Sequence, residues 1–575
     1  MRQEARFLLA IALMIGVLVS TNLLFPPVPP EEPLATGPVA GEAGAEVAPG
    51  DVFTPLPGAS PGDAVVSREP PTGPADVAAL PGILGAGTGE TVTVESPLYR
   101  FSFTTDGARM TSAQLLQFQS FAREGVVELL TEDTGGALGM QIETDQGVLD
   151  LRNLPFEVTP REGIRLDEGD APQTLTFRYE HPSGTVTVEA AYTFDPSSYL
   201  VRARTEVRGL GRALLVTDMG TGLAYNEGRQ ADESRVMAYV TNHLREGLKA
   251  EPLRKVDEPV VAEGPFIWSV FKSKYFLFAL MAGEGGDERY LGGLRVEPAL
   301  GEDQAAVSVT QPLPSDGVVD FRLLMAPQDR DLLLSFENDL EEANPYGYRW
   351  MRPVVRPVVG VVLTILNFLH ENLNVGYGWV LIIFGVMMRV VLFPLNQKAM
   401  RAQMRNMAVQ PLLQEIQKKY KDQPEKLQKE MMKLYKDHGF NPLAGCLPML
   451  LPWPVLITLF FVFQNAIQLR GESFLWMPNL SAADPLYILP LLLGVSMFLM
   501  QWISVRSMPE PNPQMKMMMW MMPIMMTFIF FRFASGLNLY YVTSNLAMLP
   551  QQWWIAQERQ KLRKKAPLKP ESSGD

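Results

Sequence analysis

One arginine stands inside an apolar run of this sequence. The stretch GWVLIIFGVMMRVVLFPLN lies between Glu371 and Lys398, and Arg389 is its only ionised residue. The run suits a bilayer span, which needs about 20 apolar residues. A charge at the centre of such a helix costs roughly 2.5–3.5 kcal/mol on insertion scales, so we expect Arg389 to line a polar cavity. The alternative is that Arg389 reaches the cytoplasmic face, because it lies about one and a half turns before Pro394.

Sequence motifs that would indicate catalysis, metal binding or nucleotide binding are weak or absent from this sequence. The segment Gly58-Ala-Ser60-Pro-Gly62 matches the G-x-S-x-G nucleophile pattern, but the surrounding sequence offers no strand before it and no helix after it. His181 and His243 are too far apart to suggest a metal or acid–base site, and neither H-E-x-x-H nor a phosphate-binding G-x-x-x-x-G-K-[ST] motif occurs. The single cysteine, Cys446, excludes an internal disulfide framework. We expect no enzyme activity, no catalytic residue, no metal and no cofactor.

The first 90 residues predict an anchor followed by a linker. Arg2 and Arg6 precede an uncharged stretch that ends at Phe25. This stretch is either a cleaved signal peptide or a retained anchor, and the absence of a clear A-x-A site favours an anchor over residues 1–25. Residues 26–90 are rich in Pro, Gly, Ala and acidic side chains, which predicts a flexible linker.

Residues 91–340 show the alternation of β-strands. Thr174–His181, a Pro-Ser-Gly turn and Thr185–Phe194 predict a β-hairpin, and a further strand is expected at Tyr199–Arg208. Two more strands are expected at Val307–Pro312 and Val318–Met325, with one helix near Arg330–Leu340. The expected fold of this domain is a large antiparallel β-sandwich.

The next segment, residues 346–372, predicts an amphipathic helix lying on the outer membrane surface. Arg349, Arg352 and Arg356 share one helical face, and the uncharged run from Pro357 to Leu369 is short for a span. If this segment crossed the membrane, the basic residues after Lys398 would lie outside, against the positive-inside rule.

The remainder predicts a five-helix membrane core over residues 376–557. A helical hairpin rich in basic residues, 399–440, is expected in the cytoplasm, with a basic cytoplasmic tail at 558–575. The hairpin's charges form either a solvated face or a contact with an anionic partner, lipid headgroups or ribosomal RNA. With the anchor, six spans place both termini in the cytoplasm. The five core spans are expected at 376–397, 443–468, 485–505, 517–532 and 536–557.

Several spaced motifs resemble the YidC/Oxa/Alb family of membrane protein insertases, in its Gram-negative YidC form. The order of an anchor, a large β-domain and a membrane core also resembles that form. The resemblance implies a periplasmic linker at 26–90 and a periplasmic β-sandwich domain at 91–340. The motifs are Arg389 with Phe393-Pro394-Leu395; Gln410-Pro411; Glu430-Met431-Met432; Asn441-Pro442-Leu443-Ala444-Gly445-Cys446-Leu447-Pro448; Asp484-Pro485; and Ser535-Gly536-Leu537-Asn538-Leu539-Tyr540-Tyr541 with Ser544-Asn545.

The resemblance implies a hydrophilic groove that opens to the cytoplasm and laterally to lipid. Arg389 occupies the family's groove position, and polar groups of other spans are candidates to complete the groove, although each of them suits an interhelical hydrogen bond better than a substrate contact. The expected groove residues are Arg389, Gln501, Asn538, Tyr541 and Ser544. The expected substrate slide consists of Cys446, Pro448 and Trp453.

Two positions depart from the family pattern. Gly385 stands where relatives often carry a hydroxyl residue, one turn before the arginine, and Arg532 stands where an apolar or aromatic residue is expected. A third feature, eight methionines within residues 515–526, fits either a surface that accepts many apolar sequences or a simple lipid-facing surface.

The function implied is a chaperone-like insertase of the bacterial inner membrane. It takes nascent membrane proteins into the groove and releases their apolar segments into lipid without nucleotide hydrolysis, alone or with the Sec translocon. The ribosome is a further possible partner, through the hairpin and tail. An anion transporter is the main alternative, but such proteins usually show repeated halves and paired broken helices, and neither is visible in this sequence.

Overall fold

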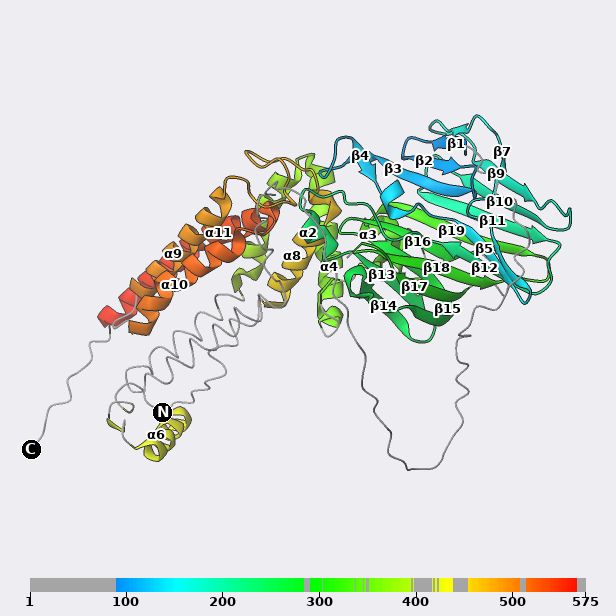
Figure 1. Cartoon of the computed structure of the whole chain (residues 1–575). Coiled ribbons are helices and arrows are strands. Elements are labelled where there is room, and N and C mark those ends of the chain that lie inside the picture. The colour runs from blue at the N-terminus through cyan, green and yellow to red at the C-terminus, as the bar shows by residue number, and fades with distance from the viewer. Residues whose placement is uncertain are drawn as a thin grey trace, which may run out of the picture. The chain divides into compact units, whose positions relative to one another are not determined.

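The computed structural model describes residues 89–565 apart from 284–289, 302, 337, 345, 348–350, 395–396, 398–415, 417–418, 421–422, 438–452 and 507–512. The anchor and most of the linker predicted from the sequence lie outside this range, as does most of the first helix of the predicted hairpin. The described residues form a β-rich domain, the β-domain, followed by a set of helices (Figure 1).

The β-domain is built from two sheets. The smaller has the order β4-β3-β2-β1-β8, and the larger has 14 strands. All strand pairs are antiparallel except β1 with β8. The smaller sheet consists of β1 (Thr91–Glu95), β2 (Tyr99–Thr104), β3 (Arg109–Gln119), β4 (Val126–Glu128) and β8 (Ile164–Arg165). The larger consists of β5 (Met140–Thr144), β6 (Gly147–Asp150), β7 (Glu157–Thr159), β9 (Gln173–Glu180), β10 (Thr187–Phe194), β11 (Leu200–Arg208), β12 (Ala213–Asp218), β13 (Ala238–His243), β14 (Gly247–Pro252), β15 (Val260–Lys272), β16 (Phe276–Ala282), β17 (Leu291–Pro298), β18 (Ala305–Pro312) and β19 (Val318–Pro327).

Aromatic side chains join the two sheets. The alternation in β2 points Phe101 and Phe103 inward, where both are fully buried. The Phe103 ring lies 5.3 Å from Tyr192 of β10 and 5.7 Å from Phe177 of β9. This packing confirms the predicted sandwich, and the hairpin and strands expected after Thr174 appear as β9, β10, β11, β18 and β19.

Short helices lead from the β-domain to the membrane helices. Asp329 caps α3 (Arg330–Ser335), since its side chain accepts the backbone N–H groups of Asp331 and Leu332. A second short helix, η3 (Leu340–Ala343), follows α3, so two helices stand where the sequence predicted one. The remaining short helices are η1 (Glu132–Thr134), α2 (Gln230–Ser234), η2 (Leu253–Lys255) and η4 (Ile467–Leu469).

The longer helices follow the predicted apolar runs. Two of them, Tyr377–Pro394 and α9, are long and apolar enough to cross a membrane, and Leu456–Asn465 and Lys516–Phe530 form shorter apolar helices. The helix that carries Arg389, Tyr377–Pro394, is called the arginine helix below. The others are α4 (Arg352–Leu373), α6 (Pro424–Asp437), α8 (Trp453–Asn465), α9 (Ile488–Arg506), α10 (Pro513–Phe530) and α11 (Ser535–Lys565).

Two details bear on the sequence predictions. The helix α6 lies within the predicted hairpin and begins at Pro424, since proline suits a first helical position. The last helix, α11, continues to Lys565 and so includes the first part of the predicted basic tail. The division into an outer domain, an interfacial helix and a cytoplasmic hairpin stays a prediction.

Candidate functional site

The arginine helix places its charge toward one end. Arg389 lies 12 residues after Tyr377, which is about 18 Å along the helix axis at 1.5 Å per residue. The neighbouring Val386, Val390 and Phe393 are exposed, as side chains that face lipid would be. Arg389 itself is half-buried, so the helix turns its charge away from its apolar surface.

Arg389 contacts α11 through one edge of its guanidinium. Its Nε donates to the Ser544 hydroxyl at 2.8 Å and to the Ser544 carbonyl oxygen at 3.0 Å. Among the described residues no carboxylate pairs with Arg389. This arrangement fixes the plane of the guanidinium through Nε, and within the described part of the chain neither terminal nitrogen has an acceptor.

Aromatic packing next to this contact holds the helices together. Tyr540 lies one turn before Ser544, with its ring 5.8 Å from Phe384 of the arginine helix and 5.5 Å from Phe463 of α8. All three side chains are buried. Three helices therefore meet at Tyr540, and the position of Arg389 relative to Ser544 follows from this packing.

The other predicted groove residues do not contact Arg389. Gln501 donates to the sulfur of Met522 at 3.5 Å and joins α9 to α10. Asn538 is fully buried, and its amide donates to the carbonyl oxygens of Phe530 and Phe533 at the turn between α10 and α11. Tyr541 packs edge-on against Phe530 with the ring centres 5.4 Å apart.

The predicted substrate slide is described only in part. Cys446 and Pro448 lie outside the described residues. Trp453 is the first residue of α8, and α8 packs through Val462 and Phe463 into the same buried cluster as the arginine helix.

Three polar residues of the helix core were not among the predicted site residues. Asn545 donates to the Ser496 hydroxyl at 3.1 Å, and both side chains are buried between α11 and α9. Gln551 lies two turns after Ser544, on the same face of α11, and its amide nitrogen is buried with no partner among the described residues. The seven-residue spacing from Ser544 is the sequence signal that identifies Gln551.

Gly385 permits a close approach of two helices. A Cβ atom at this position would lie 3.3 Å from Thr543 Cγ2 and 3.6 Å from the Tyr540 ring, both on α11. The missing side chain therefore brings α11 against the arginine helix one turn before Arg389. Arg532, the other departure from the family pattern, is exposed in the turn between α10 and α11.

One end of the helix core is closed by residues 471–484, here called the outer loop. The Asp484 carboxylate accepts hydrogen bonds from the Trp476 indole and from the backbone N–H groups of Leu486 and Leu489, so it caps α9. The backbone N–H of Ser535 donates to the Ala482 carbonyl oxygen at 2.7 Å. These bonds tie the loop to the first turns of both α9 and α11.

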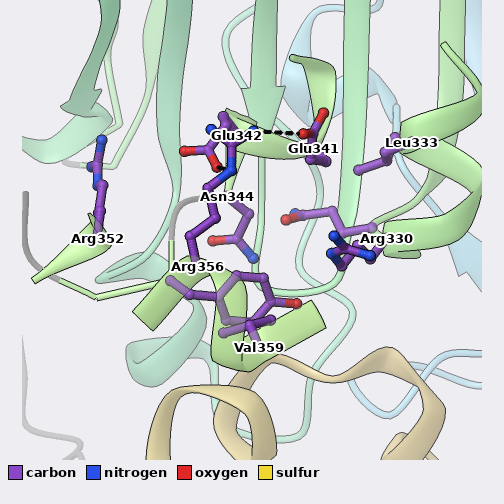
Figure 2. Close-up of a pocket in the computed structure, with 10 residues that line it drawn as sticks. Arg330, Leu333, Glu341, Glu342, Asn344, Arg352, Arg356 and Val359 are labelled. Carbon is purple, nitrogen blue, oxygen red and sulfur yellow. Dashed lines mark hydrogen bonds and ion pairs between the residues drawn. The ribbon is translucent and has the colours of Figure 1, made fainter. Parts of the chain in front are cut away.

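A separate pocket lies beside α4, lined by residues of α3, η3 and α4. Figure 2 shows Arg356 reaching Glu341 and Glu342, with Arg330 on the other side. Arg356 is 2.9 Å from a carboxylate oxygen of each glutamate. Because these charges are paired with one another, we assign the pocket to the junction of the β-domain and α4. The described residues contain no group of three or more His, Cys, Asp or Glu that could hold a metal ion.

Two family models match the chain. Residues 91–361 match the YidC periplasmic domain and residues 368–564 match the 60Kd inner membrane protein. The membrane protein insertase YidC of Chlorobaculum tepidum is 30% identical over 495 residues, which cover 82% of each chain. That of Geobacter metallireducens is 27% identical over 557 residues, 96% of this chain and 98% of the relative.

A crystal structure of an active YidC insertase with its first transmembrane domain resolved is 18% identical, with a TM-score of 0.34, and covers 81% of this chain and 92% of the other. The two family models together span both the β-domain and the helix core, and the Chlorobaculum relative matches over most of its length. The chain belongs to the YidC family of membrane protein insertases, inner-membrane proteins with a periplasmic domain that act on nascent membrane proteins in lipid.

Proposed function

We propose that this insertase receives the polar flank of a nascent membrane protein at Arg389 and passes the adjoining apolar segment sideways into lipid. The observation that carries the proposal is the hydrogen bonding of the Arg389 guanidinium, in which only Nε has an acceptor among the described residues. Its Nε is committed to Ser544, and its two terminal nitrogens have no carboxylate partner among the described residues. A planar fork of this kind suits bidentate binding of a substrate carboxylate.

The depth of Arg389 supports this role. A polar tail must cross a hydrocarbon layer about 30 Å thick, and a recess that reaches the arginine shortens this distance. A fixed positive charge in a medium of lowered dielectric attracts acidic tails more strongly than it would in water. The apolar segment then partitions into lipid, so the cycle needs no nucleotide hydrolysis.

The remaining predicted residues have graded roles in this proposal. Ser544 positions Arg389, and Gln501 and Gln551 add polar surface toward the cytoplasmic side. Asn538 and Tyr541 form the outer floor of the groove, while Cys446, Pro448 and Trp453 form the slide. We further propose that α4 lies on the outer surface, that both termini are cytoplasmic, and that the hairpin around α6 meets the ribosome, with the Sec translocon as a second partner.

Substitution of Arg389 tests the proposal. In reconstituted vesicles, Arg389→Leu is expected to slow insertion of substrates with acidic translocated tails by about tenfold, the effect of losing roughly 1.4 kcal/mol of attraction. Arg389→Lys keeps the charge and is expected to retain part of the rate. Arg532→Leu, which removes an exposed arginine of the same core, is the matched control.

Substrates with neutral tails separate the charge effect from a loss of fold, because Arg389→Leu is expected to insert them at close to the unsubstituted rate. Equal insertion of acidic-tail substrates by Arg389→Leu and the unsubstituted protein would refute the role given to the arginine. Flux of small anions through the same vesicles would instead favour a transporter.

A further inference from the structure

A second arginine, Arg470, joins the helix core to the β-domain. It directly follows η4, and its side chain is only 3% exposed. Its Nε donates to Glu227 Oε1 at 2.7 Å, and its Nη2 donates to the Asn226 carbonyl oxygen at 3.3 Å. The guanidinium carbon lies 4.5 Å from the centre of the Phe121 ring and 5.0 Å from that of Phe276. We call these four β-domain residues the Arg470 socket.

Hydrogen bonds within the β-domain hold the socket in place. Glu233 Oε2 accepts the backbone N–H groups of both Asn226 and Glu227 at 2.9 Å. The Asn226 side chain donates to the Glu128 and Ala224 carbonyl oxygens and accepts the Glu128 N–H. Bonds within the β-domain therefore position Asn226 and Glu227 for their contacts with Arg470.

The residues before Arg470 are docked on the β-domain as well. Ile467 is buried in the hydrophobic core of the β-domain. The Tyr275 hydroxyl donates to the Gln464 carbonyl oxygen at 3.4 Å, and the Gln468 amide donates to the Asp329 carboxylate at 2.9 Å. Contacts at four positions within one short segment fix the end of α8.

A buried ion pair is a poor source of stability but a strong determinant of geometry. Removing two charges from water costs about as much as their attraction returns, whereas removing one partner leaves an uncompensated charge. Arginine rather than lysine suits this site, because its plane stacks on aromatic rings while its edge binds a carboxylate and a carbonyl group. The socket therefore specifies where the end of α8 must lie.

The outer loop begins at the next residue and closes the helix core. The backbone N–H of Leu480 donates to the Glu472 carbonyl oxygen, and that of Gly536 donates to the Leu480 carbonyl oxygen at 2.8 Å. We propose that the β-domain, through the Arg470 socket, holds the outer loop shut over the outer end of the groove. This inference rests on the proposed function, since a seal matters only if the groove holds water and substrate.

Hydrogen exchange on the full chain in lipid nanodiscs tests the docking directly. Arg470→Met is expected to raise the exchange rates of amides in residues 464–484 by about tenfold or more, because Glu227 loses its partner. Arg470→Lys is expected to give exchange rates between those of Arg470→Met and those of the unsubstituted protein. The double variant Arg470→Met/Glu227→Gln, which removes both charges, is expected to return toward the unsubstituted rates. Arg295→Gln, which breaks the Arg295–Glu143 pair inside the β-domain, is the matched control and should leave this segment unchanged.

Thiol labelling tests the seal. Ser535 is fully buried beneath the outer loop, so Ser535→Cys in a Cys446→Ser background supplies a reporter there. A membrane-impermeant maleimide added from the outer side is expected to label this reporter at least about tenfold faster when Arg470→Met is also present. Equal labelling with and without Arg470→Met would overturn the proposal, as would unchanged exchange in residues 464–484.

The two proposals fail separately. Arg389→Leu is expected to leave exchange in residues 464–484 and labelling at position 535 unchanged, because Arg389 is remote in sequence from both and contacts neither among the described residues. If Arg389→Leu inserts substrates normally while Arg470→Met opens the outer loop, the proposed role of Arg389 in the groove is refuted and the proposed role of the Arg470 socket is supported. If Arg389→Leu fails to insert substrates while Arg470→Met leaves the outer loop closed, the proposed role of the Arg470 socket is refuted and the proposed role of Arg389 in the groove is supported.

Discussion

Two buried or half-buried arginines of this chain are held in opposite ways. Arg470 is held by a carboxylate, a carbonyl oxygen and aromatic faces within the protein. Arg389 meets only Ser544 among the described residues. A charge that is fully paired fixes geometry, whereas a charge whose nitrogens stay available can bind something that comes and goes. Residue type alone does not separate these roles, but the list of partners does.

The carboxylate beneath the Arg470 socket gives a prediction about pH. Burial raises the pKa of Glu233 to about 7, against the opposing effect of its hydrogen bonds from Glu227 and Asn226. A raised carboxyl pKa means that the folded state holds the proton more tightly than the unfolded chain. The Glu233 contribution to the free energy of unfolding is therefore fully present below about pH 4.5 and is lost as pH rises through 7.

Glu233→Gln removes this titration and keeps an oxygen for the two backbone N–H groups. Its β-domain is expected to be more stable than the unsubstituted one at pH 8, by up to about 3 kcal/mol, with no difference at pH 4. Thermal unfolding of the full chain followed at both pH values measures this difference. A gain of equal size at both pH values would show that the carboxylate does not titrate as described.

At the scale of elements, close helix contacts depend on small residues. Gly494 of α9 faces α10, and a Cβ atom there would lie 2.1 Å from the Thr527 hydroxyl oxygen. This spacing permits α9 and α10 to approach each other, and Figure 1 shows α9, α10 and α11 side by side. Close packing of this kind is a main source of helix association in lipid.

Gly494→Val is expected to push α10 from α9 and to destabilise the helix core by about 1–3 kcal/mol, the usual cost of overpacking. Thermal unfolding in detergent micelles measures the effect. Val495→Leu, one residue further along on the exposed surface of α9, is the control and should change little. Equal stability of the two variants would show that α9 and α10 accommodate a larger side chain at Gly494 without loss of stability.

Sequence patterns predicted the elements better than the contacts among them. Strand alternation gave β9, β10 and β11 within two residues, because each strand has one buried and one exposed face. It missed most short strands, including β4 and β8, whose two or three residues carry no period. The family resemblance puts Arg389 and Ser544 in one expected groove, but the hydrogen bond between them was not predictable, because the two residues are 155 positions apart and polar spacing gives no helix order. The Arg470 socket was missed for the same reason, since its partners lie on strands and loops of the other domain.

At the scale of the whole molecule, charge is unevenly distributed. The chain has a net charge of −13, whereas the segments around α6 and at the end of α11 are rich in lysine and arginine. Basic residues are retained on the cytoplasmic side of membrane proteins, so this distribution supports an acidic domain outside and basic segments inside.

Single-cysteine labelling in intact cells tests this orientation. In a Cys446→Ser background, Glu168→Cys in an exposed turn of the β-domain is expected to react with an impermeant maleimide. Ser573→Cys near the C-terminus is expected to react only after the inner membrane is opened. Reaction at position 573 in intact cells would place the C-terminus outside and reverse the proposed topology.

Ile467 has a consequence for how the protein matures. This residue completes the β-domain core, yet it is translated 140 residues after the last strand ends at Pro327. The core of this domain is therefore incomplete until the ribosome has synthesised the segment that follows α8. Until then, the apolar side chains that pack against Ile467 in the complete protein are not covered by this segment.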